Sequence, residues 1–160
     1  MRISDAIIEK LLARSGVATA EQIAALKEEA VRSRRPLQEL VIEREVANDQ
    51  TLTQAFADYA QIPYIELDPR DIPSDVISRI PERIARQYNA VLFKVDAEGG
   101  MQHLAMEDPD DVQAVNFIQK EIGENTKIYI ATRENILAAL ENYRGDVNQE
   151  LNEVIDVQRE

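Results

Sequence analysis

Apolar side chains recur at helical spacing from residue 4 to residue 59, and no strand-like alternation interrupts them. Gly16 favours the end of a first helix, because glycine readily adopts a left-handed cap. Thr19 and Gln22 have the spacing of a capping box that begins a second helix, and Asn48 is a natural N-cap of another. These signals predict four helices, over approximately 4–15, 19–31, 37–45 and 48–59.

The second pair of predicted helices repeats the first pair at an offset of about 29 residues. Two stacked helical hairpins that share packing rules explain such a repeat, and so does a tandem motif that binds a ligand or partner. Both interpretations stay open. The corresponding positions are Ile8 and Leu37, Leu12 and Val41, Gly16 and Glu45, and Thr19 and Asn48.

The pattern changes after Tyr59. A proline-flanked segment, 62–69, predicts an edge strand or an extended linker. Beyond it, the periodicity and the turn residues predict short helices at 74–80 and 82–88, strands at 90–95, 101–106 and 127–131, and helices at 108–121 and from 132. The ββαβα order predicts a two-layer unit with helices on one or both faces of a short mixed sheet.

The whole chain is therefore expected to be α+β, with a helical repeat subdomain at 1–60 and a small α/β subdomain at 61–144. Residues 145–160 carry five acids and one base. A solvated end would explain this last stretch, but it is more typical of an acidic linker or docking helix.

The amino-acid composition excludes several classes of function. The 160 residues contain 30 Asp and Glu against 18 Lys and Arg, a formal charge of −12, which repels phosphate backbones and argues against nucleic-acid binding. The absence of cysteine excludes disulfides, thiolate zinc sites, iron–sulfur clusters and cysteine nucleophiles. No apolar run approaches the ~18 residues of a membrane span, and no signal-peptide pattern opens the chain. We expect a cytoplasmic protein without direct membrane insertion.

Catalytic candidates are few. The glycines form neither Gly-x-x-x-x-Gly-Lys-Ser/Thr nor Gly-x-Gly-x-x-Gly, the loops that cradle phosphates. The acidic run 107–111 could hold Mg²⁺ or Ca²⁺, but an N-cap at Asp108 followed by Pro109 explains it more simply. His103 has no acid or hydroxyl at a spacing that suggests catalysis. We therefore predict no catalytic residue, no metal site and no enzyme activity for this chain.

Four arginines form a local positive island in the acidic chain. Their planar forks match phosphate and carboxylate groups, so the island could bind an anionic ligand or an acidic partner. A solvated loop between helices explains the same residues. The four are Arg14, Arg32, Arg34 and Arg35.

An ordered set of segments resembles the N-terminal domain of secretion and pilus-assembly ATPases of the GspE and PilB types. The segments are residues 11–19 with their repeat, 59–67, 81–85, 104–111 and 133–143. The resemblance implies a non-catalytic module that precedes a hexameric ATPase core, with ATP and Mg²⁺ bound only in that core. It also implies docking to the cytoplasmic domains of inner-membrane platform proteins and a peripheral place at that membrane. The acidic 145–160 stretch would then lead toward the core, which this chain does not contain.

A subgroup of that family, the MshE type, binds cyclic di-GMP through two tandem Arg-Leu-Gly-x-x-Leu motifs, each followed by a glycine. Leu37 matches a motif leucine and Gly16 matches the downstream glycine of the first copy. Glu9 stands where the first motif requires glycine, and Glu45 replaces the second downstream glycine. Arg35 lies one residue from the required arginine. The residues thus predict a degenerate motif, with protein docking as the main function and cyclic di-GMP binding as the alternative.

Overall fold

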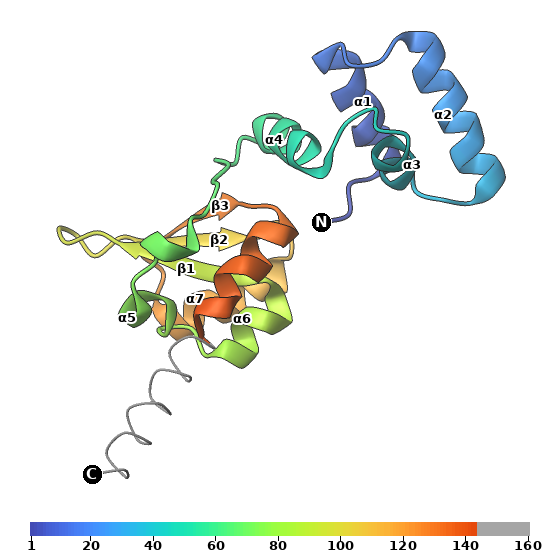
Figure 1. Ribbon diagram of the computed structural model, residues 1–160. Helices are drawn as coiled ribbons and strands as arrows, with labels where there is room; N and C mark the ends of the chain where they lie inside the picture. Colours follow the sequence, from blue (N-terminus) through green and yellow to red (C-terminus); the bar gives the residue numbers. More distant parts are fainter. Residues whose placement is uncertain (144–160) are drawn as a thin grey trace. The chain divides into compact units, whose positions relative to one another are not determined.

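The computed structural model describes residues 1–143 of the chain (Figure 1). Contacts between residues divide the chain into two compact units, the first ending at Tyr64 and the second beginning at Ile65. The predicted acidic linker, 145–160, lies outside the described residues. Within residues 1–143, no helix is both long enough and apolar enough to cross a bilayer.

The first unit contains the four predicted helices: α1 (Asp5–Ser15), α2 (Ala20–Ser33), α3 (Leu37–Glu43) and α4 (Asp49–Ala60). The predicted caps are present, because Thr19 and Gln22 exchange both bonds of a capping box and the Asn48 side chain accepts the Thr51 N–H. α3 ends at Glu43, two residues earlier than predicted.

The backbone repeats where the sequence repeats. Gly16 ends α1 in a left-handed conformation with φ of 70°, and Glu45, at the matching position, has φ of 58°. Glutamate at such a φ costs on the order of 1 kcal/mol relative to glycine. Backbone hydrogen bonds close this turn, from the Glu45 N–H to the Ile42 carbonyl at 3.1 Å and from the Val46 N–H to the Val41 carbonyl at 3.0 Å. Ile8 and Leu37, another matched pair, are both fully buried.

The second unit mixes short helices with three strands. Its elements in chain order are η1 (Pro69–Asp71), α5 (Ser74–Ile77), α6 (Glu82–Tyr88), β1 (Ala90–Val95), β2 (Gln102–Met106), α7 (Val112–Ile122), β3 (Thr126–Ile130) and a helix from residue 133 to residue 143. Together with the first unit they confirm the predicted α+β class and the ββαβα order.

The sheet has the order β1-β2-β3, with β1 antiparallel to β2 and β2 parallel to β3. All five residues of the central strand β2 are buried, so both faces of that strand are covered. The 62–69 segment is not a full strand. It is tied to β3 by a bond of 3.0 Å in which the Ile65 N–H donates to the Ile130 carbonyl.

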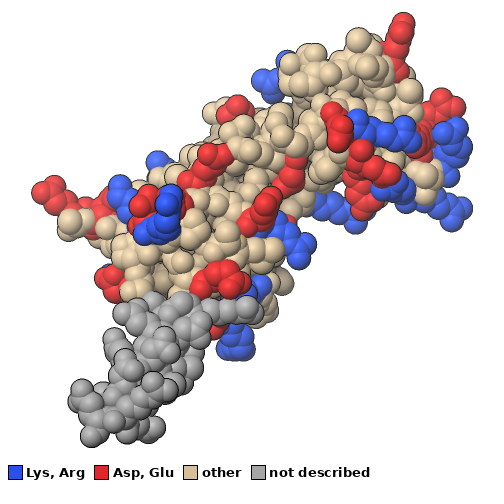
Figure 2. All heavy atoms as spheres, viewed as in Figure 1, with Lys and Arg blue, Asp and Glu red and all other residues tan. Residues whose placement is uncertain are grey.

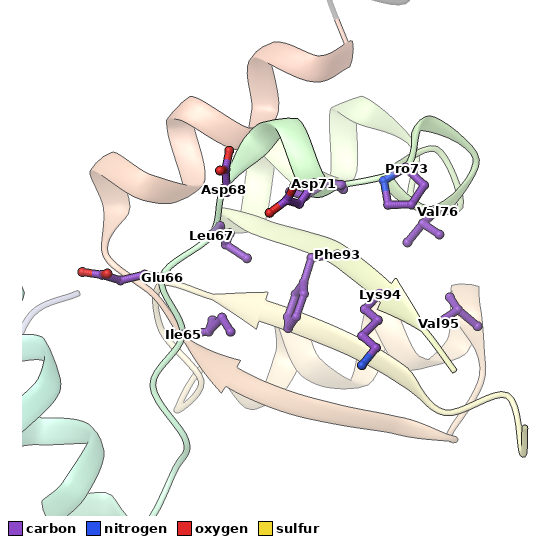
Figure 3. Close-up of a pocket in the computed structure, with 11 residues that line it drawn as sticks. Ile65, Glu66, Leu67, Asp68, Asp71, Pro73, Val76, Phe93, Lys94 and Val95 are labelled. Carbon is purple, nitrogen blue, oxygen red and sulfur yellow. The ribbon is translucent and has the colours of Figure 1, made fainter. Parts of the chain in front are cut away.

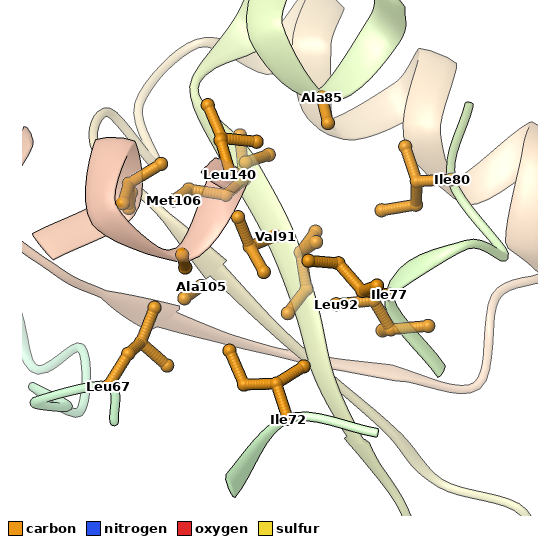
Figure 4. Close-up of a cluster of buried hydrophobic side chains, with 14 of the residues drawn as sticks. Leu67, Ile72, Ile77, Ile80, Ala85, Val91, Leu92, Ala105, Met106 and Leu140 are labelled. Carbon is orange, nitrogen blue, oxygen red and sulfur yellow. The ribbon is translucent and has the colours of Figure 1, made fainter. Parts of the chain in front are cut away.

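One hydrophobic core joins the strands to the surrounding helices (Figure 4). Ile118 of α7 and Leu140 of the 133–143 helix are fully buried in it. Tyr143 reaches the same core and its hydroxyl lies 2.7 Å from the Ile77 carbonyl and 2.8 Å from the Ile80 carbonyl. Burial raises the pKa of Tyr143 to about 12, so the phenol stays neutral and keeps donating.

The start of α7 differs from the prediction. Asp111 is the N-cap, and its carboxylate accepts the Ala114 N–H at 3.1 Å. Asp108 instead accepts the Asp110 N–H in a local turn, which satisfies its side chain and delays the helix. The predicted cap at Asp108 is therefore wrong.

Two apolar residues of α7 lie outside the core. Val112 is 65% exposed and Phe117 is 41% exposed, although Phe117 still contacts Tyr88 with ring centroids 5.8 Å apart. α5 is shorter than predicted and ends at Ile77, while Pro73 and Pro81 lie at cap positions just before α5 and α6.

Candidate functional site

The predicted arginines are exposed, but the structure does not gather all of them. Arg14 lies in the last turn of α1, whereas Arg32 and Arg34 lie in the last turn and at the C-cap of α2. α2 has 14 residues, a length of about 21 Å, and the short 16–19 connection puts Arg14 beside the opposite end of that helix. Among the described residues, these three arginines have no acidic partner. The island is therefore divided between two ends of the helical unit.

Arg35 is engaged within the unit. Its guanidinium contacts Glu43 at 2.5 Å and Glu39 at 3.5 Å. The hydrogen bond from Arg35 holds the pKa of Glu43 below its usual range, and Glu43 raises the pKa of Arg35. An anionic ligand would have to displace these carboxylates. On the face seen in Figure 2, basic side chains generally stand next to acidic ones.

Gly16 and Leu37, the remaining predicted site residues, have structural places. Gly16 is the exposed left-handed cap of α1. Leu37 is fully buried and its N–H donates to the Asp5 carboxylate at 3.0 Å. A bound ligand would meet the backbone of Gly16 more readily than the side chain of Leu37.

A cavity of about 370 Å³ lies between α1 and α2. Small side chains form most of its wall, and at one side Glu9 accepts a bond from Lys27, with 3.2 Å between Nζ and the carboxylate. None of the six predicted site residues belongs to its lining, which consists of Glu9, Ala13, Ala18, Ala20, Ile23, Ala24 and Lys27. The carboxylate that occupies the motif's glycine position therefore faces this cavity, where it disfavours phosphate.

A larger groove, of about 440 Å³, lies in the second unit (Figure 3). The 65–76 segment lines one part of it, and the end of β1 lines the rest. Its apolar residues are Ile65, Leu67, Ile72, Pro73, Val76, Phe93 and Val95, and its charged residues are Glu66, Asp68, Asp71 and Lys94. Sequence reasoning missed this groove, because its walls come from two segments that α6 separates along the chain.

Two asparagines fix the wall of the groove. The side chain of Asn135 accepts the Leu67 N–H at 2.6 Å and donates to the Leu67 carbonyl at 2.8 Å, as a neighbouring strand would. Asn142, seven residues later on the same helix, donates to the Pro69 carbonyl at 2.8 Å. Asp68 is held in turn by Arg70, whose hydrogen bond lowers the pKa of Asp68.

A bulge in β1 shapes the floor of the groove. The register with β2 shifts between Leu92 and Lys94. Regular alternation would send neighbouring side chains to opposite faces, whereas here Phe93, Lys94 and Val95 all line the groove. The Phe93 ring also meets Tyr129 edge-on, with centroids 5.2 Å apart.

His103 has the polar partners that its sequence neighbourhood did not reveal. Its Nε2 lies 3.0 Å from the Asp96 carboxylate and its Nδ1 lies 2.9 Å from the Tyr129 hydroxyl. A carboxylate only accepts, so Nε2–H donates to Asp96 and, with the ring neutral, the Tyr129 hydroxyl donates to Nδ1. Both ring nitrogens are thus occupied in a buried position, which is a structural role.

The Asp96 carboxylate gives a prediction about pH. The bond from His103 lowers the pKa of Asp96 from its ordinary 3.8. A lowered folded-state pKa adds stability above the ordinary value, and this stability is lost as the pH falls through the folded-state value. We expect Asp96→Asn to reduce the free energy of unfolding at neutral pH, and we expect the difference from the unmodified chain to shrink as the pH falls below the ordinary carboxyl pKa.

Urea unfolding across this pH range checks the expectation, with Glu98→Gln in the exposed turn as the matched control. A difference that persists undiminished at the acidic end would show that Asp96 acts through packing rather than charge.

The acidic run 107–111 is built as a turn. The Glu107 carboxylate accepts from the Asn89 amide at 2.7 Å, and burial raises the pKa of Asp108. Within residues 1–143, no group of three or more His, Cys, Asp or Glu side chains is placed to hold a metal ion.

The chain is similar in sequence to a known domain family and to two known proteins. Residues 60–150 match the MshEN domain. PilB, the type IV pilus assembly ATPase, is 23% identical over 146 residues in Myxococcus xanthus and 24% identical over 140 residues in Thermus thermophilus. The alignments cover 91% and 88% of this chain. The chain spans about a quarter of the first relative's length and about a sixth of the second's.

Solved structures share the fold. A structure of MshE with cyclic di-GMP has a TM-score of 0.67 at 20% identity and covers 84% of this chain and 96% of that one. The N-terminal domain of XpsE has a TM-score of 0.57 at 16% identity, with coverage of 88% and 96%. Because the MshEN match spans more than half of the 160 residues, the chain belongs to the MshEN domain family, among the N-terminal domains of type II secretion and type IV pilus ATPases.

Proposed function

We propose that this chain is a non-catalytic docking and regulatory domain of a type IV pilus assembly or secretion motor. It couples the motor to cytoplasmic domains of inner-membrane platform proteins and thereby stays peripheral to that membrane. ATP and Mg²⁺ belong to an ATPase core outside these 160 residues. The two PilB relatives support this assignment, since each is several times longer than the matched part.

One observation carries the docking proposal. The open groove of about 440 Å³ has apolar side chains on its walls and charged side chains among them. It also lies in the part of the chain that matches the MshEN domain. Apolar surface with charged surroundings is typical of protein interfaces, whereas this groove contains no cluster of cations for a phosphate ligand.

Purified platform domains test the proposal directly. We expect at least one cytoplasmic domain to bind the immobilised chain with micromolar affinity in biolayer interferometry. The isolated ATPase core, lacking this domain, serves as the comparison for non-specific binding. Absence of binding by every platform domain at tens of micromolar would refute the docking role.

Cyclic di-GMP binding is the second candidate, because the fold matches that of MshE, whose structure contains this dinucleotide. Two features of the first unit weaken it. Glu9 places a carboxylate in the cavity between α1 and α2, and Arg35 is paired with Glu39 and Glu43. We expect calorimetric titration with cyclic di-GMP to give no binding heat at tens of micromolar. Binding that disappears in an Arg34→Ala, Arg35→Ala double variant would instead establish a nucleotide sensor.

A further inference from the structure

We propose that the groove of the second unit binds a basic, amphipathic peptide segment of a partner protein. The proposal rests on the docking function above and names the surface and the chemistry that such docking uses. Apolar side chains of the segment would lie on the groove walls, and its lysines or arginines would face the carboxylates.

The apolar part of the argument comes from the walls. Leu67, Ile72 and Val76 are largely buried, whereas Ile65 and Phe93 are only partly covered. Apolar surface that remains exposed in a concave site lowers the free energy of the complex when a partner covers it. The bulge places Phe93 on this surface, and the Tyr129 contact fixes its ring.

The charge of the lining selects the partner. Three carboxylates, on Glu66, Asp68 and Asp71, stand against the single ammonium of Lys94. Lys94 lies 3.7 Å from Asp96, which offsets part of its charge. Asp68 is partly neutralised by Arg70, so Asp71 is the carboxylate to which we assign most of the attraction.

The electrostatic field of the whole chain is negative, like the lining of the groove. A formal charge of −12 attracts basic partners and repels acidic ones before contact. A second copy of this chain carries the same negative charge, and the acidic residues 146–160 of the chain itself do too. The complementary occupant is therefore a basic segment from another protein.

The groove is held open before any partner arrives. Asn135 and Asn142 bond the backbone of Leu67 and Pro69 from one helix, so the wall has a fixed place. A preformed site loses little conformational entropy on binding. A short peptide therefore binds it more tightly than it would bind a groove with a mobile wall.

A fluorescein-labelled peptide of alternating lysine and valine is the probe, with the full chain as receptor and fluorescence anisotropy as readout. The same peptide with glutamate in place of lysine is the matched control. We expect the lysine peptide alone to bind, with an affinity that falls as salt rises, because screening shortens the reach of exposed charges.

Charge reversal locates the site. Asp71→Lys is expected to weaken the lysine peptide about fivefold, since an attraction becomes a repulsion at an exposed position. Glu98→Lys makes the same change of charge in the exposed β1–β2 turn, outside the groove, and is expected to leave the affinity within about twofold. Both residues are exposed, so neither variant should disturb folding.

Equal weakening by the two variants would overturn the groove assignment, because it would mean that only net charge matters. Equal binding of the lysine and glutamate peptides, or no binding of either, would also overturn it. The docking function fails separately. Platform domains that bind the unmodified chain and Asp71→Lys equally well would keep docking and remove the groove. If the peptide binds the groove but no platform domain binds the chain, the groove assignment stands and the docking function fails.

Discussion

Leu104→Ala is expected to lower the free energy of unfolding of the second unit by about 3 kcal/mol. Leu104 lies in the middle of the central strand and is fully buried. It is paired with Leu92 on one side and Ile128 on the other, so neighbours on both strands lose contacts when its side chain is shortened. The effect combines lost transfer free energy with the cavity left in the core.

Leu137→Ala is the matched control for this substitution. Leu137 is 41% exposed on the 133–143 helix, and we expect a loss of under about 1 kcal/mol. Because the chain has two units, amide hydrogen exchange of β2 is a better measurement than a single global transition. Equal losses in the two variants would show that β2 is not the centre of the core.

Asn135→Ala is expected to cost about 2 kcal/mol, because it removes two hydrogen bonds to the backbone of Leu67. The loss is local. Leu67 is largely buried, so its N–H and carbonyl would be left without their partner at a poorly hydrated place. We expect the Leu67 amide to exchange faster with solvent than in the unmodified chain, while β2 amides change less.

Asn116→Ala controls for the change in helix propensity. Asn116 is exposed on α7, so both variants replace an asparagine within a helix by alanine and share any propensity gain. If the groove binds the peptide as proposed, Asn135→Ala should also weaken the lysine peptide, because the wall is no longer held. Unchanged exchange at Leu67 would contradict the positioning role of Asn135.

Local signals explain which elements could be predicted. The capping box at Thr19 and the cap at Asn48 involve residues three positions apart, so the sequence determines them without help from the fold. The glycine turn of the β1–β2 hairpin is equally local. The α+β class and the repeat in the first unit follow from signals of this range.

The tertiary structure decided the candidate sites. Asn135 meets Leu67 from 68 positions away, and His103 meets Tyr129 from 26 positions away. No pattern of spacing predicts such pairs, because they depend on which strands and helices pack together. The bulge in β1 that lets Phe93 and Lys94 line the same groove likewise depends on the register with β2.

The same division explains the errors. Asp108 and Asp111 are chemically equal candidates for a cap, and the turn that Asp108 forms with Asp110 decided between them. The ion pairs of Arg35 with Glu39 and Glu43 were likewise not foreseen from the sequence, and its role in binding stays a prediction. Sequence alone determined the order of the helices and strands and the negative charge of this protein, because these depend on near neighbours and on composition. Only the tertiary structure decided which side chains meet in a groove, because contacts across the core join residues that the chain keeps far apart.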